Sequence, residues 1–277
     1  MGMRVSTNIA AINAQRNLSG SQSNIQSSLA KLSSGSRINK AADDAAGLAI
    51  SENLKGQIRS TRQANRNAND GISMVQVAEG GLNEIGNIIT RMRELGIQAA
   101  SDTIGESERG FIDKEIQQLK DEMQRIASVT KWGTTKLLDG TTPVFDFQVG
   151  VFNNDSEDRI SFDASQNVAT LDALGLAGLD YTSKEGAQEA LSSLDDAQLG
   201  VNSMRSNLGA LQNRLMSTVN NLGVAEENLS AANSRIRDTD VAEASSELTR
   251  NNIMLQASTA TLAQANQTNA AALKLIG

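Results

Sequence analysis

The stretch that decides the fold is residues 191–236, LSSLDDAQLGVNSMRSNLGALQNRLMSTVNNLGVAEENLSAANSRI. An apolar residue occupies every seventh position without a gap, and the series is Leu194, Val201, Leu208, Leu215, Leu222, Leu229 and Ile236. Mostly small or apolar residues, from Ala197 to Ala232, follow the first six of these by three positions. Such a heptad repeat indicates a helix that packs against other helices at a left-handed supercoil angle. The stretch therefore predicts a rod of roughly 70 Å with the seven-residue series as its core.

Two further stretches have the same spacing and are candidates for neighbouring helices. The first series is Ala68, Val75, Leu82 and Ile89, and the second is Ile112, Ile116, Leu119, Met123 and Ile126. A short link, residues 101–110, joins them, and short connections make consecutive helices antiparallel. The chain contains a single proline, which favours long helices with few interruptions. We therefore expect a mainly α fold, a long antiparallel helical rod or bundle.

The period of the apolar residues changes from seven to two between these helices. Residues 144–150, VFDFQVG, and 159–164, RISFDA, both alternate apolar with polar side chains, and the connection between them is rich in turn residues. This pattern predicts a β-hairpin at about residues 143–165. The rare aromatic residues gather in this region, as expected where a small sheet buries one face: Phe145, Phe147, Phe152, Phe162 and Tyr181.

Both chain ends are predicted amphipathic helices whose second face is polar but uncharged. Their apolar residues are Val5, Ile9, Ile12, Leu18, Ile25, Leu29 and Leu32 at one end, and Val241, Leu248, Leu255 and Leu262 at the other. Residues 1–42 contain no acid, and Lys274 is the one charged residue of 251–277. Neutral amides and hydroxyls suit a face packed against protein, where an unpaired charge is costly. We expect the ends to associate with each other and with copies of themselves.

Composition narrows the possible chemistry. The chain has no cysteine and no histidine, so thiolate nucleophiles, disulfides and the commonest general base and metal ligand are all missing. The net charge of −7 does not suit nucleic acid. No stretch approaches the 18 apolar residues or so that a membrane helix needs, and the start lacks the apolar region of a secretory signal. We expect no catalysis, no cofactor, no metal site and no membrane insertion.

Long motifs near both ends resemble those of bacterial flagellins. They include TNIAAINAQRNL (7–18) and LSSGSRINKAADDAAGLAISENLKGQIR (32–59) near the amino end, and ENLSAANSRIRDTDVAEASSELTRNNI (227–253) near the carboxyl end. The matching blocks cover nearly everything outside residues 140–190. The resemblance implies a discontinuous coiled-coil domain of residues 1–44 and 235–277, a helical rod of residues 45–234, and no outer variable domains.

The function implied by the resemblance is structural. The subunit would self-assemble into the open helical flagellar filament for swimming motility, and its ends would order on polymerisation. It would leave the cell through the flagellar secretion apparatus without a cleaved signal peptide. Further implied partners are an export chaperone, the filament cap and the hook-junction proteins. One alternative is a hook–filament junction protein of the same superfamily. Another is a coiled-coil stalk, which would need a membrane anchor.

Two motifs invite more specific hypotheses. Asp43 and Asp44 could form a catalytic carboxylate pair, but acids at the start of a long helix are favoured by the helix dipole, and we prefer that interpretation. In flagellins recognised by Toll-like receptor 5, an arginine and a leucine of the RMREL motif and a glutamate on the next helix carry recognition. These map onto Arg91, Leu95 and Glu115. We prefer ordinary contacts between subunits as the role of these residues, and both roles can hold together.

Overall fold

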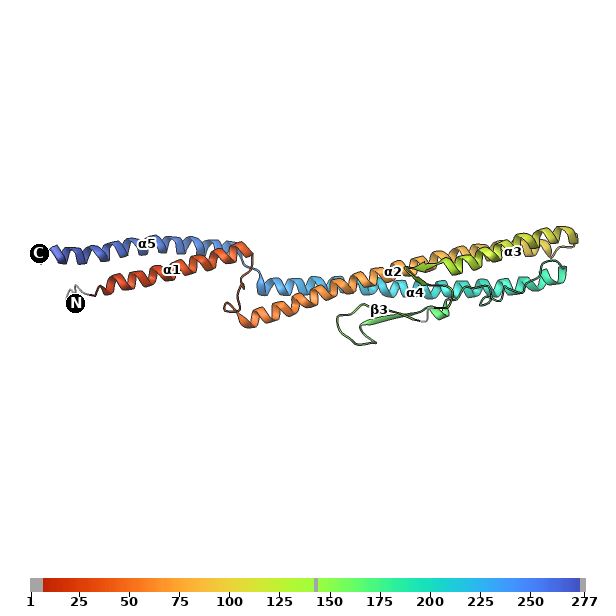
Figure 1. The fold of residues 1–277 in the computed structure, drawn as a ribbon, viewed down its shortest axis with the longest axis horizontal. Helices are drawn as coiled ribbons and strands as arrows, with labels where there is room; N and C mark the ends of the chain where they lie inside the picture. The colour runs from red at the N-terminus through yellow and green to blue at the C-terminus, as the bar shows by residue number, and fades with distance from the viewer. Residues whose placement is uncertain (1–6, 142–143, 275–277) are drawn as a thin grey trace. The chain divides into compact units, whose positions relative to one another are not determined.

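The computed structural model describes residues 7–141 and 144–274, with side chains up to residue 267 (Figure 1). Its helices are α1 (Ile9–Ser34), α2 (Ala45–Ala99), α3 (Glu106–Val129), α4 (Lys184–Arg237) and α5 (Val241–Lys274). The prediction of a mainly α fold with long helices is therefore confirmed. The chain divides into two compact units. The terminal unit comprises Met1–Gln57 and Asn228–Gly277, and the rod unit comprises Ile58–Glu227.

In the rod unit, α2, α3 and α4 enclose one apolar core. The heptad residues Leu194, Val201, Leu208 and Leu215 of α4 are fully buried in it, and Leu222 is half-buried. The heptad series of α2, from Ala68 to Ile89, is also fully buried. The buried positions of these series are filled by large aliphatic groups or by alanine, and the hairpin residue Phe147 also packs near Gly71 and Leu215. The last two residues of the α4 series, Leu229 and Ile236, are half-buried and belong to the terminal unit.

The turn between α2 and α3 is held by a buried arginine. Arg109 is 8 % exposed, and its Nε donates to the carbonyl of Ala99 at 2.8 Å while its Nη2 donates to that of Ser101 at 2.9 Å. These carbonyls end α2 and lack partners within the helix. Glu106 and Glu108 lie in the first turn of α3, where the helix dipole favours acids.

Two small antiparallel strand pairs follow α3. The first pair is β1 (Lys131–Trp132) with β2 (Thr135–Lys136), and the second is β3 (Val144–Gln148) with β4 (Arg159–Asp163). The second pair is the predicted hairpin, and a short 3-10 helix, η1 (Ala164–Gln166), comes directly after it. Phe145 faces Phe162 across the pair, with their ring centroids 6.1 Å apart. The hairpin packs on α2 and α4, since an added Cβ on Gly71 would lie 3.1 Å from Phe147 and 3.3 Å from Leu215.

In the terminal unit, α1 and α5 run antiparallel as a two-helix coiled coil (Figure 1). At the end near the termini, Asn8 caps α1 and its Nδ2 donates to the carbonyl of Ala265 at 2.9 Å. At the other end, Arg37 donates its backbone N–H to Arg237, and Thr239 donates to Gly35. Gly35 ends α1 with a φ of 68°, a left-handed conformation that glycine adopts without strain. The coiled coil is thus joined by hydrogen bonds at both ends.

Candidate assembly surface

The buried seam of the α1–α5 coiled coil is thin. The positions of α1 that turn toward α5 recur at alternating steps of three and four, and they are Ala11, Ala14, Leu18, Ser21, Ile25, Ser28 and Leu32. On α5 the corresponding series is Ala244, Leu248, Asn251, Leu255, Ser258, Leu262 and Ala265. Only small residues among the described side chains of this seam are buried, namely Ala14, Ser28, Ala244 and Ser258, and they are between 4 % and 9 % exposed. Every larger side chain of the seam keeps part of its surface exposed, because two helices enclose less than three do.

A second apolar face of the coiled coil points outward. Ile9, Ile12 and Leu29 on α1 are between 49 % and 60 % exposed. Ile253 and Met254 on α5 are between 53 % and 60 % exposed. An outward face rich in large aliphatic groups is unusual for a helix whose remaining surface is neutral. The face is therefore a candidate for contact with other copies of the chain.

The apolar residues predicted to pack in a filament core thus fall into two groups. Leu18, Ile25, Leu32, Leu248, Leu255 and Leu262 lie in the seam, whereas Ile9, Ile12 and Leu29 lie on the outward face. Val241, one heptad before Leu248, continues the seam series but is 61 % exposed at the start of α5. Val5 lies outside the described residues. The heptad reasoning found the large residues but missed the small ones between them. Their signal was the spacing itself, because Ser21 and Ser28 continue the steps of three and four.

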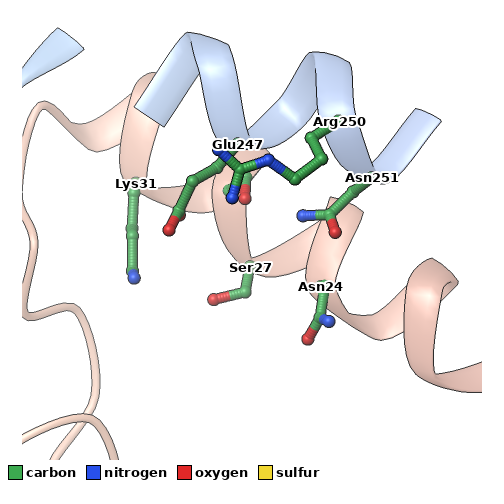
Figure 2. A pocket seen from close by; sticks show the side chains of 7 residues that line it. Asn24, Ser27, Lys31, Glu247, Arg250 and Asn251 are labelled. Carbon is green, nitrogen blue, oxygen red and sulfur yellow. The ribbon is translucent and has the colours of Figure 1, made fainter. Parts of the chain in front are cut away.

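A polar groove lies between the last part of α1 and the first part of α5 (Figure 2). It has a volume of about 260 Å³ and is lined from α1 by Asn24, Ser27, Ser28 and Lys31, and from α5 by Glu247, Arg250 and Asn251. Figure 2 shows the charged side chains of both helices grouped at this groove. Within the described part of the chain, Glu247 and Arg250 form neither an ion pair nor a side-chain hydrogen bond. The groove therefore contains charged side chains that form no ion pair within the described part of the subunit.

The carboxylates of Asp43 and Asp44 both accept hydrogen bonds from backbone N–H groups. Asp43 Oδ2 accepts the N–H groups of Asn39 at 3.0 Å and Lys40 at 2.9 Å, and these bonds, led by Lys40, lower the pKa of its carboxyl group. Asp44 Oδ1 accepts the N–H of Gly47 at 2.8 Å and so caps the start of α2. The preference for a helix start over a catalytic pair agrees with these bonds. Over the described ranges, no cluster of three potential metal ligands is found, and no helix is long and apolar enough to cross a bilayer.

Of the three candidate receptor residues, the structure brings two together. Arg91 Nη2 lies 3.0 Å from Glu115 Oε1, and Arg91 Nη1 lies 3.0 Å from Glu94 Oε2. Both side chains of the Arg91–Glu115 pair are about half exposed, and the hydrogen bonds with Glu94 and Glu115 raise the pKa of Arg91. Leu95 is 3 % exposed and belongs to the rod core. The surface that a partner could touch here is therefore the ion pair between α2 and α3.

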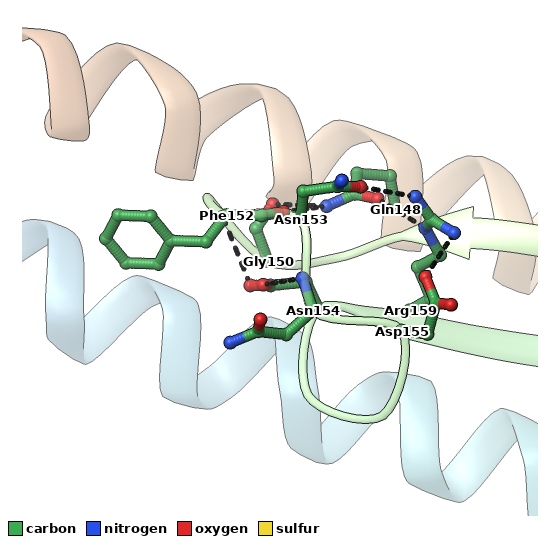
Figure 3. Close-up of polar contacts among 8 residues, drawn as sticks. Gln148, Gly150, Phe152, Asn153, Asn154, Asp155 and Arg159 are labelled. Carbon is green, nitrogen blue, oxygen red and sulfur yellow. Dashed lines mark hydrogen bonds and ion pairs between the residues drawn. The ribbon is translucent and has the colours of Figure 1, made fainter.

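Asp158 forms hydrogen bonds that connect the two ends of the β3–β4 hairpin loop. The buried Asp158 carboxylate accepts the N–H of Phe152 at 3.2 Å and that of Asn154 at 3.0 Å. Its carbonyl accepts the N–H groups of Val149 and Gly150. The expectation that the aromatic residues of this region bury one face is wrong for Phe152, which is 67 % exposed and projects from the loop (Figure 3). The hairpin pattern could not reveal this, because Phe152 lies beyond the alternating strand.

The chain matches two family models described as the bacterial flagellin N-terminal helical region, over residues 5–142, and the bacterial flagellin C-terminal helical region, over residues 191–276. It is 46 % identical to a flagellin of Halalkalibacterium halodurans over 274 residues, which covers 99 % of this chain and all of that one. It is 42 % identical to a flagellar filament core protein of Brachyspira hyodysenteriae, covering 99 % of this chain and all of that one.

Solved structures show the same fold. A flagellin of Bacillus cereus superposes with a TM-score of 0.50 at 30 % identity, over 57 % of this chain and 88 % of that one. A putative flagellar hook-associated protein of Vibrio parahaemolyticus superposes with a TM-score of 0.58, over 71 % of this chain and all of that one. Its 13 % identity shows a shared fold alone. With two family models and relatives matched from end to end, the chain belongs to the bacterial flagellin family, whose members are structural subunits of the flagellar filament.

Proposed function

We propose that this chain polymerises into the filament through the outward apolar face of its α1–α5 coiled coil. The observation that carries this proposal is the half-exposed series Ile9, Ile12, Leu29, Ile253 and Met254. Burying one such side chain against a neighbour stabilises an assembly by about 1.5–3 kcal/mol relative to leaving it in water. A contact between different faces of successive copies does not close and so generates an open helix. The coiled coil of residues 1–44 and 235–277 would form the filament core, with the rod of residues 45–234 around it.

The thin seam supports a second part of the proposal, that the terminal helices order on polymerisation. A helix gains most of its stability from packing, and among the described side chains of this seam the buried positions are alanine and serine. Ordering a residue costs roughly 1–2 kcal/mol of backbone entropy, which such small contacts offset only in part. Neighbouring copies would cover the outward face and supply the rest. A subunit built this way does not polymerise before it reaches the growing end.

We also propose an export route and accessory partners, which family membership supports. Filaments of this family are extracellular, and this chain would reach the outside through the flagellar secretion apparatus without a cleaved signal peptide. The neutral, leucine-striped α5 suits a chaperone that shields it before export. The filament cap would bind the terminal helices at one end of the polymer, and the hook-junction proteins would bind them at the other end. Limited order in the terminal unit suits passage through a narrow channel.

Contact with Toll-like receptor 5 is a further proposal, centred on Arg91 and Glu115. Their exposed ion pair offers a planar guanidinium and a carboxylate side by side on α2 and α3. Leu95 would support this surface from below, since it is buried in the rod core. The same residues would be covered by a neighbouring copy if the rod surface is also a subunit contact.

Polymerisation of purified subunit tests the proposed assembly face. We expect Ile12→Ser and Ile253→Ser to raise the critical concentration for filament growth by about tenfold or more, because each removes a large apolar contact. Ile50→Ser is the matched control, since Ile50 is 52 % exposed in the terminal unit but lies on α2. Wild-type growth by the two variants, measured by sedimentation, would contradict the assembly face. Long filaments of wild-type subunit would also exclude the hook-junction alternative.

Limited proteolysis tests ordering on polymerisation. Trypsin sites at Arg16, Lys31 and Arg250 lie in the coiled coil. We expect rapid cleavage there in the monomer, leaving a fragment near residues 45–235, and protection in the filament. Equal cleavage rates in monomer and filament would show that polymerisation does not order these helices.

A further inference from the structure

The α1–α5 coiled coil has very few charges, and half of them are placed close together. Helix α1 contains two bases, Arg16 and Lys31, and no acid. Helix α5 contains Glu243, Glu247, Arg250 and Lys274. The groove described above gathers Lys31, Glu247 and Arg250 within about 260 Å³ of shared space (Figure 2). The groove thus holds three of the six charged residues of these two helices at one level along the coiled coil.

These charges are not used inside the subunit. Several exposed arginines of the rod unit form ion pairs across helices, as with Arg62 and Glu226 at 2.6 Å and Arg93 and Asp195 at 2.6 Å. At the groove, by contrast, no ion pair within 4.0 Å joins Lys31, Glu247 or Arg250 to any described residue. Lys31 acts only at a distance, by helping to lower the pKa of Asp43. This difference indicates that the charged side chains of the groove are available to bind a partner outside the chain.

The two acids of α5 are arranged unfavourably for a helix in isolation. Glu243 and Glu247 are four residues apart, so both lie on one face, and like charges at this spacing destabilise a helix by a few tenths of a kcal/mol. Glu243 lies in the first turn, where the helix dipole compensates it, but Glu247 lies beyond that turn. Cations placed opposite both carboxylates would relieve the repulsion. No base of α1 or α5 forms such an ion pair in the described subunit.

We propose that Lys31 and Arg250 of one copy bind the Glu243–Glu247 carboxylates of a second copy, so that an ion-pair site links neighbouring coiled coils. This inference rests on the proposed function, in which coiled coils pack against one another. Charge complementarity selects the occupant. The groove carries two bases and one acid, and Glu243 and Glu247 are the acids of α1 and α5. A second copy packed coil against coil can therefore present a carboxylate only from these two positions.

The site would set the register between copies. The apolar residues of both helices repeat every seven positions, so an apolar face alone tolerates a slip of one heptad, or about 10 Å. A single level of charge breaks that degeneracy, because a slipped register buries Arg250 or Glu247 without a partner. The leucine contacts then provide the affinity between copies, and the charged groove determines the register between them. This is the use for which polar positions in coiled coils are best known.

Charge reversal in purified full-length subunit tests the proposal. We expect Glu247→Arg and Arg250→Glu each to raise the critical concentration by about tenfold or more, since each places like charges across the contact. A mixture of the two variants should copolymerise near the wild-type concentration. Mixing restores opposite charges only between copies, so rescue cannot come from an ion pair within one helix. Circular dichroism of each monomer checks that the helix content is unchanged.

Arg16→Glu is the matched control, because it makes the same charge change on the same coiled coil outside the groove. Mixing Arg16→Glu with Glu247→Arg should give no rescue. Equal rescue by this control would show that overall charge, not the groove, controls assembly, and would overturn the proposal. Wild-type polymerisation by both single variants would overturn it as well. Failure of the wild-type chain to polymerise would instead defeat the proposed function, so the two failures are distinguishable.

Discussion

The rod unit and the terminal unit have the same seven-residue pattern of apolar residues, yet their apolar side chains are buried to very different extents. In the rod, Leu194, Val201, Leu208 and Leu215 are fully buried in one apolar core. In the coiled coil, leucines at the same spacing stay partly exposed, and among the described side chains of the seam only alanine and serine are buried. Heptad spacing therefore determines which residues face a neighbouring helix. The number of neighbours determines how much stability that contact provides.

A pair of leucine truncations gives the largest expected contrast between the units. Leu208→Ala in the rod should lower the free energy of unfolding by about 2–5 kcal/mol, because it leaves a cavity in a closed core. Leu255→Ala in the seam should lower it by less, about 1–2 kcal/mol in the monomer, since Leu255 is partly exposed there and its truncation leaves no closed cavity. Denaturant unfolding followed by circular dichroism and by fluorescence of the single tryptophan, Trp132, measures both effects.

Polymerisation should reverse this order. Leu255→Ala should raise the critical concentration markedly, because the assembled coiled coil buries the seam more completely, whereas refolded Leu208→Ala subunit should still assemble. Equal losses of monomer stability for the two variants would contradict the proposed difference in packing between the two units. The coiled coil would then be as well packed in the lone subunit as the rod.

Alkaline pH probes the rod core at its single tyrosine. Tyr181 is fully buried, and its hydroxyl has no hydrogen-bond partner among the described residues. Burial raises the pKa of Tyr181 to about 12 from an ordinary value of 10.0, with a smaller contribution from Asp113. The unfolded chain therefore loses this proton first as the pH rises. Stability that is complete below pH 10 should fall by about 2–3 kcal/mol between pH 10 and pH 12.

Tyr181→Phe isolates this effect from other groups that titrate in alkali. The variant should match or exceed wild-type stability at pH 7, because it removes an unsatisfied buried hydroxyl, and it should lack the extra loss above pH 10. Ultraviolet titration of tyrosinate absorbance in the folded wild type gives the pKa directly. A value near 10 would show that solvent reaches this part of the rod.

The buried arginine of the α2–α3 turn should have a slightly smaller effect. Arg109→Met keeps much of the side-chain volume but leaves the carbonyls of Ala99 and Ser101 without their donor. We expect a loss of about 1.5–3 kcal/mol of unfolding free energy, the usual value of hydrogen bonds to a charged group. Lys114→Met is the control, because Lys114 lies on the same helix and forms no ion pair in the described chain. Comparable losses for both variants would mean that Arg109 acts through helix propensity.

The sequence predicted the helices and the hairpin because both depend on the spacing of apolar residues along the chain. Asp44 as a helix start was also predictable, since the preference of acids for that end is local. Burial of Leu95, exposure of Phe152 and the grouping of Lys31 with Arg250 were not predictable. Each depends on which distant segment covers a position, and spacing along one helix does not contain that information. The seam serines lie between these cases, because their spacing was visible but their type suggested a surface.

The smallest effect on stability is expected at the exposed ion pair of the rod. Arg91→Ala should change the unfolding free energy by less than about 1 kcal/mol, because both Arg91 and Glu115 are about half exposed to water. The proposed receptor contact, however, should weaken sharply, since a partner would lose the guanidinium that Glu115 and Glu94 hold in place. Arg125→Ala is a matched control, because Arg125 is an exposed arginine paired with Glu122 on α3. Equal activation of receptor-bearing reporter cells by wild-type and Arg91→Ala monomer would show that the receptor does not contact this site. Such a result would not affect the described packing of the rod.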